Sequence, residues 1–111
     1  MTDDSFENVI LELRRGVIVL AVLSQLNREK YGYSLINSLQ KDGLEIDQGT
    51  LYPLLRRLES QGLLMSSWRI ETDRPRRYYM ISDEGRTLLP RLKEEWNNIV
   101  SMMNRMLKQG E

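Results

Sequence analysis

The chain contains neither cysteine nor histidine. Without cysteine, disulfide bonds and thiolate metal sites are unavailable. Without histidine, the chain lacks the most common general base and the most common metal ligand, which excludes serine–histidine catalysis and zinc chemistry. A glycine-rich phosphate-binding loop is also missing from the sequence. These absences predict a protein that is not an enzyme and that uses no metal and no cofactor.

A long hydrophobic run is also missing. The apolar segment Gly16–Leu26 follows two arginines, as the core of a signal peptide does. However, it is too short to span about 30 Å of hydrocarbon, and no small-residue cleavage pattern accompanies it. We interpret this segment as a buried helix, and we expect a cytoplasmic protein that has no membrane partner.

The sequence has no net charge, because 16 basic residues balance 16 acidic ones. The distribution of charge is uneven, however. Residues 50–80 contain six arginines but only three acidic residues, whereas the first 13 residues contain four acidic residues and no basic one. A neutral chain with one basic region is compatible with a nucleic-acid binder whose non-specific affinity is restrained.

The segment Gly49–Leu64, GTLYPLLRRLESQGLL, has the pattern of a helix with two different faces. Its leucines recur at i, i+3, i+4 and i+7, which is typical of a helix packed on a core. Tyr52, Arg56 and Arg57 point away from that stripe. Guanidinium forks and an aromatic hydroxyl suit phosphate oxygens and base edges in a DNA groove. Two adjacent arginines on a solvated helix are also common, so the helix alone leaves both interpretations open.

A strand, a basic turn and a second strand follow this helix. LLMSSWRI (Leu63–Ile70) places Leu64, Ser66, Trp68 and Ile70 on one side, and YYMIS (Tyr78–Ser82) is rich in strand-forming residues. Between them, ETDRPRR is expected to form a turn, because Pro75 breaks regular structure there. A basic helix followed by a hairpin that carries arginines is the layout of a winged helix-turn-helix.

The remaining segments complete a mainly α fold with a small β-hairpin. Ser5 is the expected N-cap of a first helix, and Tyr31–Gly43 form a second helix that Gly43 ends. Leu44–Ile46 are expected to add a short strand beside the hairpin, and Asp47 or Thr50 caps the basic helix. We divide the chain into a winged helix-turn-helix domain at residues 1–82 and a C-terminal dimerisation helix at residues 83–111, which Ser82 caps.

The C-terminal helix carries an apolar seam. Leu89, Leu92, Trp96, Ile99, Met103 and Met106 recur at alternating spacings of three and four residues, as in a short coiled coil. The seam either packs on its own domain or pairs with a second copy of the chain. Its position after the hairpin favours a dimer, and two-fold symmetry would then set two basic helices about one DNA turn apart, roughly 34 Å.

The chain resembles the PadR family of bacterial transcriptional regulators from about Val9 to Leu89. The resemblance is carried by YGYSLI (Tyr31–Ile36), by GTLYPLLRRLESQGLL, and by RPRRYYMISDEG (Arg74–Gly85). The Thr-x-Tyr-Pro run ahead of the leucine ladder is specific, because generic winged helices do not share it. The single short C-terminal helix is similar to that of the smaller branch of the family.

This resemblance implies a homodimeric repressor that binds a palindromic operator in double-stranded DNA and is released by a small effector. It places the DNA-binding residues on the recognition helix, the supporting helix and the wing: Thr50, Tyr52, Arg56 and Arg57, then Tyr33 and Ser34, then Arg74, Arg76 and Arg77. It implies a dimer interface from the first and last helices: Phe6, Val9, Ile10, Leu92, Trp96, Ile99, Val100 and Met103.

Trp96 has two possible roles. In some similar regulators a tryptophan on the last helix stacks on flat aromatic compounds, so Trp96 either binds an aromatic effector or anchors the dimer. The chain as a whole also has an alternative interpretation, in which a winged helix binds another protein and no DNA. Activation instead of repression is compatible with the same fold, because the sign depends on operator placement.

Overall fold

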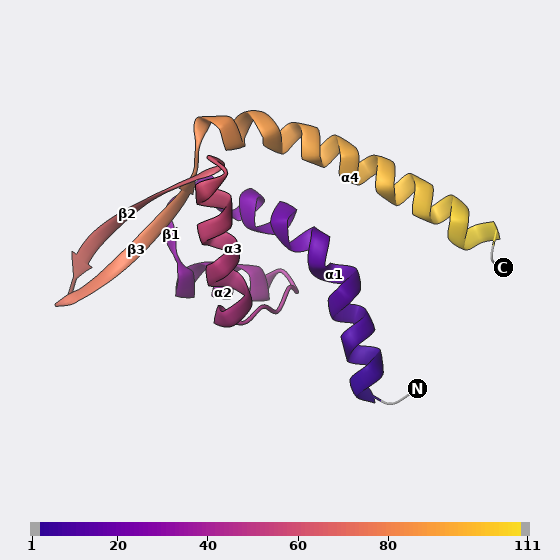
Figure 1. Ribbon diagram of the computed structural model, residues 1–111, viewed down its shortest axis with the longest axis horizontal. Helices are drawn as coiled ribbons and strands as arrows, with labels where there is room; N and C mark the ends of the chain where they lie inside the picture. Colours follow the sequence, from indigo (N-terminus) through magenta and orange to yellow (C-terminus); the bar gives the residue numbers. More distant parts are fainter. Residues whose placement is uncertain (1–2, 110–111) are drawn as a thin grey trace.

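The computed structural model describes residues 3–109, which form four helices and three strands (Figure 1). In chain order these are α1 (Asp3–Gln25), β1 (Lys30–Tyr31), α2 (Gly32–Lys41), α3 (Gln48–Ser60), β2 (Leu64–Glu71), β3 (Arg74–Ile81) and α4 (Asp83–Gln109). The expected class, a mainly α fold with a small hairpin and a winged helix-turn-helix, is confirmed. Among the described residues, none of the helices is long and apolar enough to cross a membrane.

The core lies where α1, α2 and α3 meet the root of the hairpin. The leucine stripe predicted for α3 is buried as expected, and its members contact leucines of α1 and α2 and the first residue of β2. Burial of each such side chain contributes about 1.5–3 kcal/mol. The fully or nearly fully buried residues are Val22, Leu23, Leu26, Leu35, Leu39, Leu51, Leu54, Leu55, Leu58, Leu64, Tyr79 and Ile81. This core sets the orientation of α3.

Two helices end in the same backbone motif. After α2, the Gly43 N–H donates to the Gln40 carbonyl at 3.0 Å and the Leu44 N–H donates to the Leu39 carbonyl at 2.9 Å. Gly43 has a φ of 98°, so the predicted stop is confirmed. α3 ends likewise at Gly62, whose φ is 82°. The motif explains why the predicted strand at 44–46 was wrong, because the Leu44 N–H is already used in closing α2.

The third strand lies elsewhere. Lys30 and Tyr31 form β1, which pairs antiparallel with β3 so that Tyr31 lies opposite Tyr78. The sheet order is therefore β1-β3-β2, with β3 in the centre. The pair is only two residues long, too short for a period of two to identify it in the sequence.

The hairpin is longer and its turn shorter than expected. β2 and β3 have eight residues each and are joined by Thr72 and Asp73, whose φ values are 45° and 66°. Pro75 was expected in the turn, but it lies in β3 opposite Ile70. Proline is tolerated there because β1 does not reach this end of β3, so that no strand within residues 3–109 pairs with its outer edge. The hairpin extends well away from the helices (Figure 1).

The first and last helices differ in how they begin. α1 begins at Asp3, so Ser5 lies inside the helix and the predicted N-cap was wrong. The acidic residues Asp3 and Asp4 instead occupy the first turn, where the helix dipole favours them. At α4 the prediction is confirmed, because the Ser82 hydroxyl accepts from the Gly85 N–H at 3.0 Å. α4 continues through Pro90 and projects beyond the core (Figure 1).

Candidate nucleic-acid interface

The outer face of α3 carries the two expected arginines. The backbone N–H of Thr50 donates to the Asp47 carboxylate at 2.7 Å, which makes Asp47 the N-cap. Arg56 and Arg57 are exposed, and so are Thr50 and Pro53. The buried leucines on the opposite side hold the helix with this face outward. The arrangement presents two guanidinium groups that can form paired hydrogen bonds with phosphate oxygens or guanine edges.

Tyr52 has a packing role in addition to any contact with a ligand. Its side chain is half-buried, and a Cβ added at Gly32 would overlap the Tyr52 ring. The start of α2 can therefore approach α3 this closely only because residue 32 is glycine. This contact brings Tyr33 and Ser34 near α3. The role of Gly32 was not predicted, although its place inside the YGYS motif was visible.

The two polar residues at the start of α2 differ in whether their hydroxyl groups are free to bind another molecule. Tyr33 is 57% exposed. Ser34 is half-buried, and its hydroxyl donates to the Tyr31 carbonyl at 2.9 Å. Ser34 can therefore offer an outside group only its oxygen lone pairs, whereas the Tyr33 hydroxyl is open to solvent.

The hairpin has two faces that differ in chemistry. We call them the α3-side face and the β1-side face. The α3-side face consists of alternate residues of both strands: Leu64, Ser66, Trp68, Ile70, Pro75, Arg77, Tyr79 and Ile81. The β1-side face consists of the residues between them: Met65, Ser67, Arg69, Glu71, Arg74, Arg76, Tyr78 and Met80. The predicted side shared by Leu64, Ser66, Trp68 and Ile70 is confirmed by this register.

On the α3-side face, Arg77 is held by α3. Its guanidinium donates to the Glu59 carboxylate at 2.6 Å and to the Ser66 hydroxyl at 3.0 Å. The Ser66 hydroxyl donates to the same carboxylate. Burial raises the pKa of the neighbouring Tyr79 phenol, and the cations of Arg77 and Arg56 partly oppose that rise. Arg77 therefore fixes the hairpin against α3, and Arg56 lies close enough to influence the same phenol.

On the β1-side face, two arginines cover two tyrosine rings. The Arg76 guanidinium lies 4.4 Å from the centre of the Tyr31 ring, and the Arg69 guanidinium lies 4.4 Å from that of Tyr78. Each arginine also has an acidic partner, Glu71 for Arg76 and Glu29 for Arg69. These contacts order the side chains of this face.

The Tyr78 hydroxyl is part of the same arrangement. It donates to the Glu71 carboxylate at 2.6 Å, and this hydrogen bond is the main reason why the pKa of Tyr78 is raised. Glu71 thus serves both Tyr78 and Arg76. Of the three wing arginines named from the sequence, Arg76 and Arg77 lie on opposite faces and are both engaged within the chain, whereas Arg74 is exposed beside the turn.

The helices α1 and α4 expose apolar side chains. Phe6 is 59% exposed and Trp96 is 38% exposed, and Val9, Ile99 and Met103 are also exposed. Ile10, Leu92 and Val100 are half-buried. Further exposed apolar residues lie on the same two helices, among them Met106 of the predicted seam: Leu11, Leu13, Met102, Met106 and Leu107. Such an accumulation of apolar surface is typical of a face that another chain covers.

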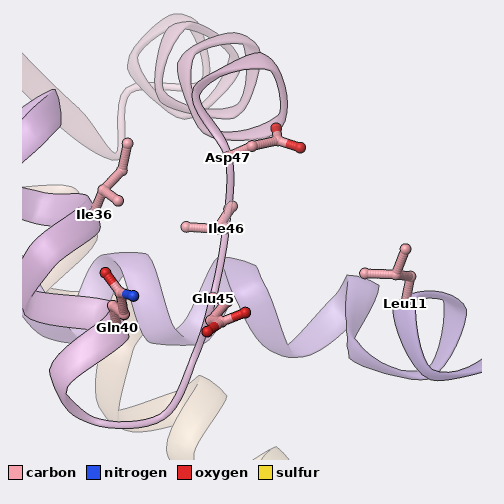
Figure 2. A pocket seen from close by; sticks show the side chains of 6 residues that line it. All are labelled: Leu11, Ile36, Gln40, Glu45, Ile46 and Asp47. Atoms are coloured by element: carbon pink, nitrogen blue, oxygen red, sulfur yellow. The ribbon is translucent and has the colours of Figure 1, made fainter. Parts of the chain in front are cut away.

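A hollow of about 450 Å³ lies between α1 and the loop that precedes α3 (Figure 2). Leu11 borders it from α1, Ile36 and Gln40 from α2, and Glu45, Ile46 and Asp47 from the loop. The exposed Leu11 connects this hollow to the apolar surface of α1. We therefore group the hollow with the helical surfaces and not with the arginine-bearing face of α3.

Known proteins are similar to this chain in sequence and in fold. The Transcriptional regulator PadR-like family matches residues 19–91. Transcriptional regulator Rv3488 of Mycobacterium tuberculosis is 38% identical over 79 residues, which are 70% of this chain and 74% of that protein.

Solved structures agree with this result. The crystal structure of a PadR family transcriptional regulator from Eggerthella lenta has 46% identity and a TM-score of 0.88, over 95% of this chain and 94% of that one. A PadR family transcription regulator from Clostridium difficile has 30% identity and a TM-score of 0.72, over 81% of this chain and 97% of that one.

Proposed function

The chain belongs to the PadR-like family of transcriptional regulators, a family of regulators and not of enzymes, and on that premise we propose that it is a homodimeric repressor that binds a palindromic operator and is released by a small effector. Family membership implies DNA binding. The observation that carries the proposal is the exposed pair Arg56 and Arg57 on a helix whose other side is fully buried in the core. Such a helix can enter a major groove as a rigid body.

Residues of α3, α2 and the hairpin would contact the DNA. Thr50, Arg56 and Arg57 are exposed on α3 and would contact base edges and phosphates. Tyr33 would donate its hydroxyl to a phosphate beside α2, while Tyr52 and Ser34 would add contacts with the groups that packing leaves accessible. Arg74 would contribute its charge from the wing, and Arg76 and Arg77 would contribute theirs only after leaving the internal partners described above.

The DNA-binding test is an anisotropy titration. A labelled duplex from upstream of this protein's own gene is compared with a scrambled duplex over a salt series. We expect tighter binding to the native duplex, with a log–log salt slope of about −0.9 for each neutralised phosphate. Arg91→Ala, on the exposed side of α4, is the charge-matched control for Arg56→Ala and should bind like the wild type. Equal, weak binding to both duplexes and to a pool of random duplexes would favour the alternative protein-interaction role.

The dimer proposal rests on the apolar surfaces of α1 and α4. Phe6, Val9 and Ile10 on α1 and Leu92, Trp96, Ile99, Val100 and Met103 on α4 would be covered by the second copy. Ile99→Glu should convert the dimer to a monomer in sedimentation equilibrium. Ser101→Glu introduces the same charge on an exposed position away from the seam and should leave the dimer intact. A wild-type monomer would refute this part of the proposal.

The effector proposal concerns Trp96. Its ring is partly exposed on α4 and would stack on a flat aromatic compound or anchor the dimer. The test is quenching of Trp96 fluorescence by aromatic cations, measured in a Trp68→Phe background so that the wing does not contribute. Quenching that is accompanied by release of DNA would support an effector site. Unchanged fluorescence across a panel of such compounds would leave Trp96 as an interface residue.

A further inference from the structure

The outer part of the α3-side face ends in an apolar patch that is largely exposed; the Arg77 guanidinium lies 5.8 Å from the centre of the Trp68 ring at its inner edge. Trp68 is 66% exposed and Ile70 is 82% exposed, and Pro75 lies directly opposite Ile70. We call Trp68, Ile70 and Pro75 the wing-tip patch. Large apolar side chains that are exposed next to each other lose the stabilisation that burial would bring, so their grouping on one face calls for a partner.

The patch is continuous with the arginine-bearing surface of α3. Glu59 of α3 binds Arg77 and Ser66 of the hairpin, which anchors the root of the α3-side face to the helix. Arg77 is paired in the sheet with Trp68, the first member of the patch. Tyr79, on the same face, is also influenced by the Arg56 cation of α3, which opposes the rise in its pKa that burial causes. A duplex that receives α3 in its major groove would therefore meet the outer part of this face next.

The charges of the hairpin do not favour a simple phosphate clamp on this face. Arg77 is occupied by Glu59, while Arg69 and Arg76 lie on the β1-side face over tyrosine rings and beside acidic partners. Arg74 also belongs to the β1-side face by register. Apart from Arg77, which Glu59 holds and which lies beside the Trp68 ring, the outer part of the α3-side face offers apolar contact in place of charge.

We propose that Ile70 and Trp68 enter the minor groove next to the major groove that α3 occupies, and that they favour A·T pairs there. The inference rests on the proposed DNA binding. The minor groove is about 6 Å wide, and branched or cyclic apolar side chains such as isoleucine and proline are among the wedges that proteins insert into it. Guanine places an amino group on the floor of this groove, and an apolar side chain cannot accept its hydrogen bond.

The proposal makes the wing a reader of the sequence that flanks each half-site. An inserted Ile70 would be favoured where base steps unstack easily, and Trp68 would pack against the sugars that line the groove. This selectivity comes from shape and from the absence of the guanine amino group, and it needs no direct hydrogen bond to a base.

The test uses a duplex that the full-length protein itself selects from a random pool, with its flanks then changed to A·T, G·C or inosine·C pairs. Inosine·C lacks the minor-groove amino group but keeps the major-groove pattern of G·C. We expect the wild type to bind A·T and inosine·C flanks alike, and to bind G·C flanks about fivefold or more weakly, as for a mismatched base pair. If inosine·C instead behaves like G·C, the reader is in the major groove and the inference is wrong.

Variants connect the effect to the patch. Ile70→Ser and Trp68→Ser should reduce the preference among the three flanks, whereas Met65→Ser, at an exposed apolar residue of the β1-side face, should retain it. Trp68 fluorescence in a Trp96→Phe background should change when DNA binds. Circular dichroism melting checks that each variant is folded.

Two failures are distinguishable. If the wild type binds a selected duplex but the Ile70 and Trp68 variants bind all three flanks as the wild type does, the inference is overturned and the DNA-binding function stands. If no duplex is enriched from the pool, the proposed function fails and the inference fails with it.

Discussion

α3 and the β2–β3 hairpin both carry arginines, but they hold them in different ways. α3 buries four leucines, so the core determines its orientation and Arg56 and Arg57 remain exposed. The described residues of the hairpin that are buried lie near its root, Leu64, Tyr79 and Ile81, and its arginines are positioned by acids and aromatic rings. Arginines on the two elements therefore differ in whether they are free to contact another molecule. Their tertiary partners determine this difference.

The largest expected difference between the two regions is in stability. Leu55→Ala removes a fully buried side chain from α3 and should lower the free energy of unfolding by about 2–5 kcal/mol. Ile70→Ala, at an exposed position of the hairpin, should change it by less than about 0.5 kcal/mol. Urea denaturation of both variants measures the contrast. Similar losses for the two would mean that the hairpin tip is buried, for example in the dimer.

The next contrast is in DNA binding. Arg56→Ala should weaken operator binding by about 1–3 kcal/mol if its guanidinium reads a base. Arg76→Ala, which removes a guanidinium that lies over Tyr31 and beside Glu71, should weaken binding much less. Anisotropy titrations on specific and scrambled duplexes separate the cases. An equal loss on both duplexes for Arg56→Ala would identify a phosphate contact in place of base reading.

Glycine substitutions test how the start of α2 supports α3. Gly32→Ala forces a methyl group against the Tyr52 ring and should destabilise the fold by about 0.5–3 kcal/mol while weakening operator binding. Gly16→Ala adds its methyl group where no atom lies within 4 Å, and should stabilise α1 by up to about 1 kcal/mol. Thermal melting measures both the expected loss of stability in Gly32→Ala and the expected gain in Gly16→Ala. A stable Gly32→Ala protein with normal DNA affinity would show that Tyr52 can move without consequence.

A substitution in the hairpin turn is expected to increase stability. Thr72 and Asp73 both have positive φ, a conformation that costs most residues about 1–2 kcal/mol and that Asn-Gly accepts readily. Thr72→Asn combined with Asp73→Gly should therefore stabilise the hairpin by about 1 kcal/mol. Amide hydrogen exchange along β2 and β3 would report it as slower exchange. Exchange that is unchanged or faster would contradict the expected strain.

The smallest effect concerns the contact between the two regions. Glu59→Gln removes the charge that holds Arg77, at a cost of about 1 kcal/mol or less because the pair is partly exposed. The released Arg77 should then reach a phosphate, which makes the log–log salt slope of DNA binding steeper by about 0.9. Glu94→Gln on α4 is the charge-matched control. An unchanged slope would mean that Arg77 stays in place without Glu59.

Periodicity in the sequence was sufficient for much of this fold. The leucine spacing identified the buried face of α3, and alternation identified which β2 residues share a side, because both patterns follow directly from local backbone geometry. The predictions that rested on short or overlapping sequence patterns were wrong. The two-residue strand β1 is too short to show a period. Pro75 was assigned to the turn because the pairing of β3 was unknown. Ser5 was assigned as an N-cap, but α1 begins earlier, at Asp3.

The sequence by itself determined the helix faces, the hairpin and the family, since these depend on residues close together in the chain. Only the tertiary structure decided which charged and aromatic side chains are available. Glu59 and Arg77 are 18 residues apart and Tyr52 meets Gly32 across two helices, so no local pattern reveals either contact. The physical reason is that these interactions depend on how far apart two groups lie in space and not along the chain. The packing of α3 against the sheet and α2 sets those distances.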